Sequence, residues 1–188
     1  MTTTQQEQDV IDLLLVQHRE IEALFAEVRG TAGNARKQAF HQLVRLLAVH
    51  ESAEELIVHP ASRYEAGDAV VDTCLREEND AKRELTNLYA LGTDAPGFDA
   101  MFAAFERTVI AHARREEQQE FPLLRRNVDP AKLRRMAGAV RAAEAFSPTR
   151  PHAGCGESAK TMMVAGPPMA IFDRMRDVVR DWHKADKE

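Results

Sequence analysis

The chain has 188 residues, a length that suits one domain with a sizeable buried core. Charged residues make up 29% of it and aromatic residues only 6%, while Ala, Leu, Glu and Arg recur throughout, which favours helices over sheets. The net charge of -5 excludes a general electrostatic attraction for nucleic acid or an anionic membrane surface. We therefore expect an all-α protein that binds neither.

Cysteine usage and hydropathy add two further exclusions. Cys74 and Cys155 stand far apart and form no CxxC pair, so neither a disulfide framework nor a thiolate zinc site is indicated. The amino-terminal segment has no basic stretch followed by an apolar one, and nowhere do roughly 18 apolar residues run together. These features predict a reduced, cytoplasmic protein without a signal peptide or a membrane-spanning helix.

The first helix is expected to run from about Thr4 to about Arg29. Thr4 has Glu7 three residues later, the spacing of a capping box. The inward face of this helix has a single polar member, His18. That face consists of Ile11, Leu14, His18, Ile21, Phe25 and Val28.

The second helix is predicted over about residues 35–58, because Pro60 cannot continue it. Its inward face contains both apolar and ionisable residues, namely Phe40, Leu43, Leu47, His50, Glu54 and Ile57. Residues four apart on a helix lie on one face, so His50 and Glu54 both point into the core. Burying an unpaired carboxylate costs several kcal/mol, so such a group needs a proton, a salt bridge or a cation.

Two more helices follow the same pattern. A loop through Tyr64 and Gly67 is expected to lead into a third helix that starts near Asp68. Its inward face is Val71, Cys74 or Leu75, Glu78, Ala81, Leu85 and Leu88. The breaker cluster at 92–97 precedes a fourth helix. The inward face of that helix is Phe98, Phe102, Phe105, Val109, His112, Glu116 and Leu123.

Four helices of similar length joined by short loops predict an up-down-up-down antiparallel four-helix bundle. Every inward face carries at least one ionisable residue, and these should converge in the interior. They are His18, His50, Glu54, Glu78, His112 and Glu116. Three imidazoles and three carboxylates without sulfur are a donor set for one or two transition-metal ions. The alternative, a buried salt-bridge network, would be an expensive way to fill a bundle.

Residues 50–55 and 112–117 have matching His-x-x-x-Glu-Glu patterns, each followed by a proline at 60 or 122. Together with His18, these segments resemble the hemerythrin-like (HHE cation-binding) family over about residues 10–128. The resemblance implies two non-haem iron ions, bridged by oxo and carboxylate groups. It also implies that each segment supplies an imidazole to one iron and a carboxylate that can bridge both.

Several ligand positions stay open. Hemerythrins carry histidines on the third helix, but residues 76–82 contain none. Glu78 is the expected substitute because it lies on the inward face, and Glu77 and Asp80 are further candidates. Glu117 competes with Glu116 for the bridging position, and the helical register favours Glu116. Roles as additional ligands or as neighbours that tune the site are open for Glu51, Glu55, Glu117 and Tyr64.

The remaining polar candidates lie off the inward faces or in the tail. His41, His59, His152 and His183 are expected to be solvent-facing or structural. Residues 1–146 are expected to form the bundle domain, and residues 147–188 a Pro/Gly-rich linker with an amphipathic helix from about Pro168. That helix should dock on the bundle or on a second subunit, in a monomer or a homodimer.

The resemblance implies chemistry with O2, hydrogen peroxide or NO. We predict a di-iron protein whose centre reacts with O2 or hydrogen peroxide in a catalase-like or other redox-stress role. The alternatives are a protein that binds or senses O2, NO or redox state without turnover, and an iron store; manganese in place of iron also stays open. Glu78 in place of third-helix imidazoles adds anionic oxygen donors, which should stabilise the diferric state and disfavour reversible O2 carriage.

Overall fold

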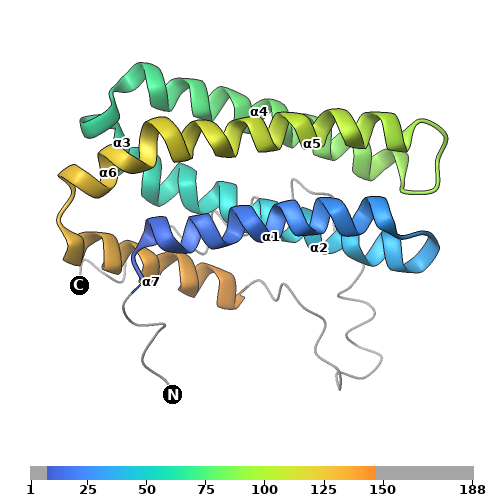
Figure 1. The fold of residues 1–188 in the computed structure, drawn as a ribbon, viewed down its shortest axis with the longest axis horizontal. Coiled ribbons are helices and arrows are strands. Elements are labelled where there is room, and N and C mark those ends of the chain that lie inside the picture. The colour runs from blue at the N-terminus through green and yellow to red at the C-terminus, as the bar shows by residue number, and fades with distance from the viewer. Residues whose placement is uncertain (1–7, 147–188) are drawn as a thin grey trace.

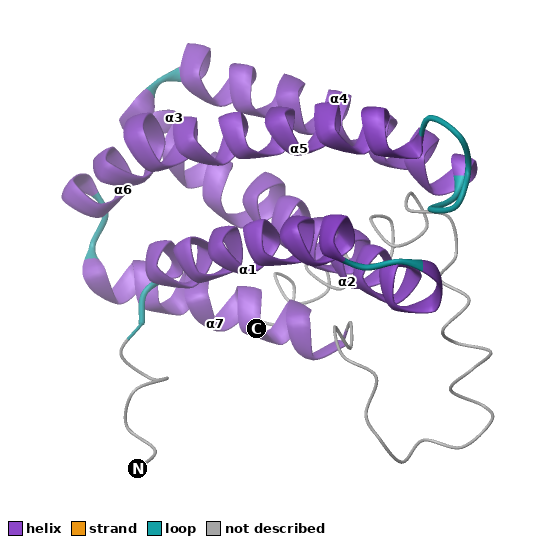
Figure 2. Cartoon of the chain, turned by 45° about the vertical axis from the view of Figure 1, so that its right-hand side comes forward, coloured by secondary structure: helices purple, strands orange, loops and turns teal. Residues whose placement is uncertain are grey.

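The computed structural model describes residues 8–146, and helices are the only regular elements in that part of the chain (Figures 1 and 2). The helices are α1 (Val10–Gly30), α2 (Gly33–Ala53), α3 (His59–Ala66), α4 (Asp68–Leu91), α5 (Phe98–Arg115), α6 (Phe121–Asn127) and α7 (Pro130–Phe146). Two π-helical turns, η1 (Glu54–Val58) and η2 (Glu116–Glu120), join α2 to α3 and α5 to α6. The all-α prediction is confirmed. The linker and tail helix predicted after residue 146 lie outside the described residues.

Figure 1 shows α1, α2, α4 and α5 lying along one another, with the chain reversing direction between successive members. The short segment between α1 and α2 and the loop at 92–97 lie at one end of the bundle. The two π turns, α3 and α6 lie toward the opposite end. The bundle therefore has two distinct halves along its length.

The helix α1 begins at Val10 rather than near Thr4. Asp9 has an extended backbone, and its carboxylate accepts a hydrogen bond from the backbone N–H of Asp12 at 2.9 Å. The backbone N–H of Asp9 donates to the Asp12 carboxylate at 3.4 Å in return. This reciprocal pair is a capping box, displaced along the chain from the predicted one. Thr4 and Glu7 lie outside the described residues.

The two π turns each lie directly before a proline. The backbone N–H of His59 donates to the carbonyl of Glu54, and that of Phe121 donates to the carbonyl of Glu116, five residues back in both cases. Pro60 and Pro122 come next, in the first turn of α3 and α6. A proline lacks the N–H that an α-helical bond would need, and the widened turn leaves space for its ring.

The predicted end of the second helix at residue 58 and the predicted loop up to Gly67 are therefore wrong. The helical path continues past Pro60 as α3 and ends only at Ala66. Gly67 then turns the chain into α4 with a φ of 86°, a backbone conformation that glycine adopts without steric cost. The helix α4 then starts at Asp68, which agrees with the predicted start near Asp68.

Aromatic rings fill the half of the bundle near the α1–α2 connection. Their centroids lie 5.2 Å apart for Phe25 and Phe102, and 5.3 Å apart for Phe40 and Phe98. The fully buried members of this group are Phe25, Phe40, Phe98, Phe102 and Phe105. Tilted and edge-to-face ring pairs of this kind stabilise a core beyond their buried area.

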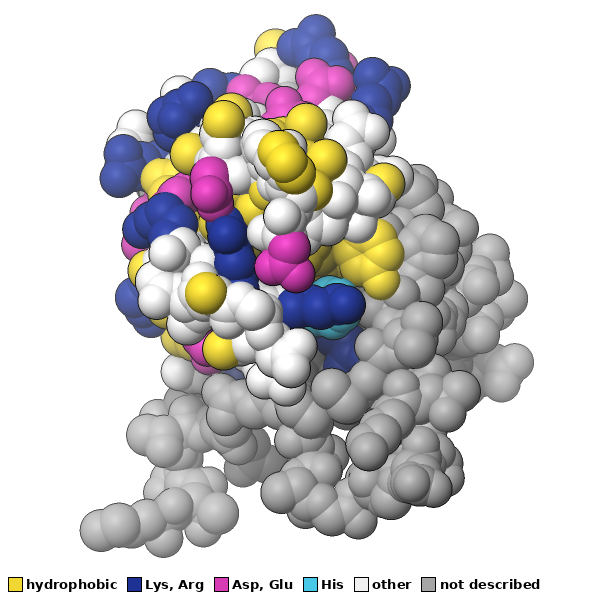
Figure 3. Space-filling model, turned by 90° about the vertical axis from the view of Figure 1, so that its right-hand side faces the viewer, with side chains coloured by type: hydrophobic (Ala, Val, Ile, Leu, Met, Phe, Trp, Pro, Cys, Tyr) yellow, Lys and Arg dark blue, Asp and Glu magenta, His cyan; other side chains and the backbone are white. Residues whose placement is uncertain are grey.

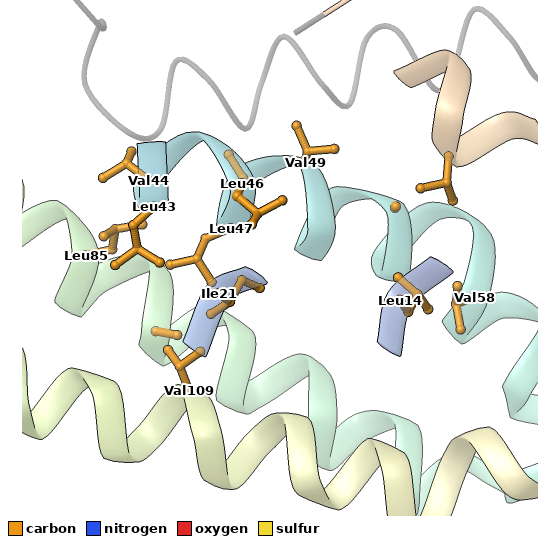
Figure 4. Close-up of a cluster of buried hydrophobic side chains, with 14 of the residues drawn as sticks. Leu14, Ile21, Leu43, Val44, Leu46, Leu47, Val49, Val58, Leu85 and Val109 are labelled. Atoms are coloured by element: carbon orange, nitrogen blue, oxygen red, sulfur yellow. The ribbon is translucent and has the colours of Figure 1, made fainter. Parts of the chain in front are cut away.

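Aliphatic layers flank the polar residues along the bundle. Figure 4 shows Ile21 with Val109 in one group, and Leu14 with Val58 in another. Along α1, His18 lies between Leu14 and Ile21 in the sequence. The predicted ionisable residues thus occupy a layer that has apolar packing on both sides.

The helix α7 packs against α1, α2 and η1. The sequence patterns above predict no separate helix at this position. Asp129 caps it, because its carboxylate accepts from the backbone N–H groups of Ala131 and Lys132 at 2.8 and 3.1 Å. Its buried side chains are Leu133, Met136, Ala137, Ala139 and Val140.

The described surface carries charges of both signs. Figure 3 shows basic and acidic side chains interspersed over the end of the bundle that holds the α1–α2 and α4–α5 connections. Two ion pairs near this end, Arg29 with Glu106 and Arg36 with Asp99, tie α1 and α2 to α5. Among the described residues, no helix combines the length and apolar character needed to cross a bilayer.

Candidate metal centre

The six residues predicted as ligands come together in the half of the bundle that contains the π turns. Each of them is at most 8% exposed. They form two groups in which one ligand atom of each residue lies within 4.8 Å of the others. The first group is His18, His50, Glu54 and Glu116, and the second is Glu54, Glu78, His112 and Glu116.

The first group joins α1, α2 and the two π turns. The Nε2 atoms of His18 and His50 lie 3.1 Å apart. The Nε2 atom of His50 lies 3.3 Å from Glu54 Oε2. The Nε2 atom of His18 lies 3.5 Å from Glu116 Oε2. Two imidazoles and two carboxylates thus face one point.

The second group joins α4 to α5 and the π turns. The Nε2 atom of His112 lies 3.3 Å from Glu116 Oε1 and 4.0 Å from Glu78 Oε1. Glu116 therefore turns one oxygen toward His18 and the other toward His112. Glu54 and Glu116 belong to both groups, which is the arrangement expected of bridging carboxylates.

Each of the three histidines is held from behind through its Nδ1 atom. The partners are Glu117 for His18 at 2.8 Å, Gln17 for His50 at 2.9 Å and Glu77 for His112 at 3.1 Å. A neutral imidazole that donates from Nδ1 presents the lone pair of Nε2 on its other side. Carboxylate or amide oxygens behind a histidine are typical of metal ligands, because they fix both the tautomer and the ring orientation.

The polar atoms at the centre of the cluster fit a cation. The atoms that make no hydrogen bond of acceptable geometry include both carboxylate oxygens of Glu54 and Glu116, Oε2 of Glu78 and Nε2 of His112. An unsatisfied buried polar atom costs about 1–3 kcal/mol, so six of them converging on one place need a common partner. Nitrogen and carboxylate donors without thiolate are suited to iron, manganese or zinc.

Electrostatics inside the cluster are unbalanced without a cation. Burial and the neighbouring Glu116 raise the pKa of Glu54 well above its usual value. Burial acts on Glu116 in the same direction, but the charge of His112 outweighs it and holds the pKa of Glu116 well below the usual range. Burial lowers the pKa of His112, yet Glu116 raises it to about 10. In the metal-free protein Glu54 and His112 therefore tend to hold protons, and a bound cation would displace these protons.

Among the three acidic candidates of α4, the structure brings Glu78 to the cluster. Glu78 is fully buried and belongs to the second group. Glu77 lies behind His112 and pairs with Arg115. Asp80 is exposed and pairs with Arg83. Likewise Glu117 contacts the back of His18, whereas Glu116 faces the interior.

Three other candidates differ in their positions. Tyr64 is 91% exposed and does not reach the cluster. Glu55 pairs with Lys82, a buried lysine of α4. Glu51 is buried, its Oε2 atom has no hydrogen-bond partner, and burial raises its pKa to about 8.

Two residues at the centre of the polar half were not expected there. His59 is 1% exposed, and its Nε2 atom lies 2.5 Å from Glu78 Oε1. Its Nδ1 atom lies 2.9 Å from Glu120 Oε1, and Glu120 is fully buried. Burial alone would lower the pKa of His59, but its hydrogen bonds to Glu120 and Glu78 raise it to about 11. The expectation that His59 stays apart from the inward residues is wrong.

The π turn η1 explains why the position of His59 was not predicted. Nine residues are about 2.5 turns of an α-helix, so a regular helix would place His59 on the face opposite His50. The wider turn η1 rotates His59 inward instead. In the same way η2 brings Leu124 into the core, where Leu123 was predicted. Glu120 lies four residues after Glu116 and therefore faces inward with or without the turn. The signal in the sequence is a proline directly after residue 59 and another directly after residue 121. Residues 59 and 121 each lie nine positions after a histidine, His50 and His112.

A small apolar pocket adjoins the cluster on the side of the aromatic half. Its inner end is formed by His18, His50 and His112. Its apolar walls include Ile21, Leu47, Ala81 and Val109. Glu22, an exposed residue of α1, also lines it, which places its outer end at the surface.

Comparison with known proteins shows the family of the chain. A family model described as the hemerythrin HHE cation-binding domain matches residues 9–124. An uncharacterized hemerythrin-like protein from Schizosaccharomyces pombe is 22% identical over 177 residues, which cover 92% of this chain and 87% of that protein. A DNA nickase from Nostoc sp. is 26% identical over 140 residues, or 74% of this chain. The match spans only 40% of the nickase, which is the longer protein.

A solved structure shows the same fold. It is the crystal structure of a hemerythrin HHE cation-binding domain-containing protein from Mycobacterium kansasii, which is 17% identical to this chain. The TM-score is 0.68, with 89% of this chain and 99% of the other covered. The family match covers more than half of the chain and includes every residue of the two groups. This chain is therefore a helical metal-binding protein that belongs to the hemerythrin HHE cation-binding domain family.

Proposed function

We propose that the chain holds two non-haem iron ions and uses them in reactions with O2 or hydrogen peroxide. The observation that carries this proposal is the sharing of Glu54 and Glu116 between the two groups of ligand atoms. A single ion would need only one group and would leave buried carboxylate oxygens of the other unpaired. Two positions with shared carboxylates are the simplest way to satisfy all of them.

The residues divide into terminal and bridging ligands. His18 and His50 would hold one ion, and His112 and Glu78 the other. Glu54 and Glu116 would bridge them. A pair of adjacent irons would exchange two electrons with the reactant: the reduced pair would give two electrons to O2 or to one hydrogen peroxide, and the oxidised pair would take two from another hydrogen peroxide, which leaves as O2. The protein contributes the positions of the ligands and the exclusion of bulk water.

The pocket supports a small, uncharged reactant. Its walls are mainly apolar, and the imidazoles of His18, His50 and His112 close its inner end. O2, NO and hydrogen peroxide fit such a space, whereas a charged or larger substrate would have to shed its hydration against apolar side chains. Glu51 also lines the pocket, and its buried Oε2 atom has no hydrogen-bond partner within the protein. This carboxyl group can therefore form a hydrogen bond with a reactant that enters.

Turnover of peroxide is favoured over reversible O2 carriage. The second group contains three carboxylates and a single histidine, so its donors are mainly anionic oxygens. Oxygen donors stabilise ferric iron. They therefore oppose the transfer of electrons back to the iron, which has to occur before O2 can leave. A stable O2 complex that dissociates on deoxygenation would contradict this part of the proposal.

The alternative functions make different demands on the chain. A sensor needs a route from the iron to a partner, and residues 147–188 are the candidate segment for that route. A chain shortened to residue 146 should keep peroxide turnover if the protein is an enzyme, and should lose its response if it is a sensor. An iron store should take up iron beyond two ions per chain.

The test is peroxide consumption by aerobically purified protein, followed with an oxygen electrode after its iron content is measured. We expect two irons per chain and O2 evolution. Glu78→Gln should remove the activity, whereas Asp80→Asn, on the exposed face of the same helix, should retain it. Iron without peroxide consumption would favour binding and sensing. Protein that takes up no metal would refute the proposal.

A further inference from the structure

The two groups of ligand atoms are unequal in nitrogen. The first group has two imidazoles and two carboxylates, and the second has one imidazole, that of His112, and three carboxylates. The helix α4 contributes no histidine to the second group. A nitrogen donor from another element would make the two positions similar.

His59 lies where such a donor is missing. It comes from the first residue of α3, and its Nε2 atom is 2.5 Å from Glu78 Oε1. It also shares a group of closely spaced ligand atoms with Glu116 and Glu120. Glu78 and Glu116 are both members of the second group. His59 thus adjoins the second position through two of its carboxylates.

The hydrogen bonds of His59 repeat the pattern of the three predicted ligands. Its Nδ1 atom is held by Glu120 at 2.9 Å, as the Nδ1 atoms of the others are held by Glu117, Gln17 and Glu77. In all four cases Nε2 is the nitrogen left toward the carboxylates of the interior. Glu120 is fully buried, and its second oxygen has no partner.

A purely structural histidine explains this pattern less well. Burying an imidazole between Glu78 and Glu120 requires desolvation of both carboxylates. A serine or an apolar residue at position 59 would fill the helix without that cost. The π turn η1 is needed to bring the residue inward, and such turns frequently occur at functional sites.

We propose that His59, held by Glu120, is a fourth imidazole ligand of the metal centre and supplies the nitrogen that α4 lacks. The proposal rests on the proposed function, since it assumes two metal positions. In it Glu120 is a positioning residue that fixes the ring of His59. The turn η1 rotates this imidazole toward the ion beside Glu78.

The test is anaerobic Fe(II) titration of the full chain, with a colorimetric chelator as competitor, so that the affinity of each equivalent is read separately. In His59→Gln one of the two equivalents should bind about 100-fold more weakly, and the other should be unchanged. Glu120→Gln should weaken the same equivalent about tenfold. His41→Gln is the matched control, because His41 is half-buried against Tyr89 in the aromatic half, and it should change neither equivalent.

The outcomes separate this inference from the proposed function. Wild-type protein that binds fewer than two equivalents refutes the proposed function. Two wild-type equivalents that persist with unchanged affinity in His59→Gln refute only the role of His59. Circular dichroism shows whether His59→Gln is folded. If it does not fold, Glu120→Gln decides, and unchanged affinity in that variant overturns the proposal.

Discussion

In the half of the bundle near the α1–α2 connection, five phenylalanine rings fill the interior and pack against one another. In the other half, four histidines and five glutamates are buried, and several of their atoms have no hydrogen-bond partner. Both halves are buried to a similar degree. The difference lies in what burial does to the free energy of folding. It stabilises the aromatic half and costs free energy in the metal-free polar half.

The backbones differ in the same way. The aromatic half is built from regular α-helix, in which each side chain faces where a period of 3.6 residues puts it. The polar half contains both π turns, at Glu54–Val58 and Glu116–Glu120. One half of the molecule is thus arranged for stability and the other for binding. Each prediction below tests one side of this contrast.

The largest expected difference is between two single-residue deletions of exposed residues, Arg107 in α5 and Gln118 in η2. Deleting Arg107 rotates the following residues of a regular helix by about 100°, which turns Val109 and His112 out of the core. We expect a loss of more than about 4 kcal/mol, or no folded protein. Deleting Gln118 should convert the π turn into an ordinary α turn and keep the later side chains inward, at a cost of about 3 kcal/mol because Pro122 then lies inside a regular helix. Urea unfolding followed by circular dichroism measures both losses of stability. Equal losses would show that η2 does not contain one residue more than a regular helical turn.

Truncation in the aromatic half should be the next largest effect. Phe25 is fully buried and packs against Phe102 and Phe105. Phe25→Ala should lower the free energy of unfolding by about 3–5 kcal/mol, because it leaves a cavity among rings that cannot close up. Met101→Ala, at a position 40% exposed, should change it by less than about 0.5 kcal/mol. A folded Phe25→Ala variant that bound less iron per chain would contradict the separation of the two halves.

In the polar half, removal of a buried side chain should have the opposite sign. Glu54 is fully buried and neither of its carboxylate oxygens has a hydrogen-bond partner, so Glu54→Leu should raise the stability of the metal-free protein by about 1–2 kcal/mol. The same variant should lose metal binding. Glu20→Leu, on the exposed face of α1, is the control and should be neutral within about 0.5 kcal/mol. If Glu54→Leu destabilises the metal-free protein, the carboxylate has a structural partner and the cation is not needed.

The contrast also explains which parts of the molecule could be predicted from sequence. The inward residues of α1 and α4, and those of α5 up to Glu116, follow the helical period, and the structure buries them as expected. The six predicted ligands lie in regular α-helix or at the first residue of a π turn and therefore keep that register; they are His18, His50, Glu54, Glu78, His112 and Glu116. The prediction failed beyond that point. His59 and Leu124 follow an inserted residue, and a fixed period cannot detect the rotation that it causes.

A last prediction concerns the access of water and reagents to the polar half. Cys74 is fully buried in α4 beside His112 and Glu116, and burial raises the pKa of its thiol. In a Cys155→Ser background, alkylation of Cys74 at neutral pH should be at least about 100-fold slower in folded protein than in urea. Mass spectrometry of the alkylated chain measures this rate. Rapid labelling of folded protein would mean that solvent reaches the cluster freely.

The central claim is that Glu54 and Glu116 join two metal positions into one centre. The most direct measurement is Mössbauer and electron paramagnetic resonance spectroscopy of the full chain after loading with two equivalents of 57Fe(II) and oxidation in air. We predict that both irons form one spin-coupled ferric pair, so that the sample gives no ferric resonance signal. A signal from isolated high-spin ferric ions that accounts for the bound iron would contradict the claim.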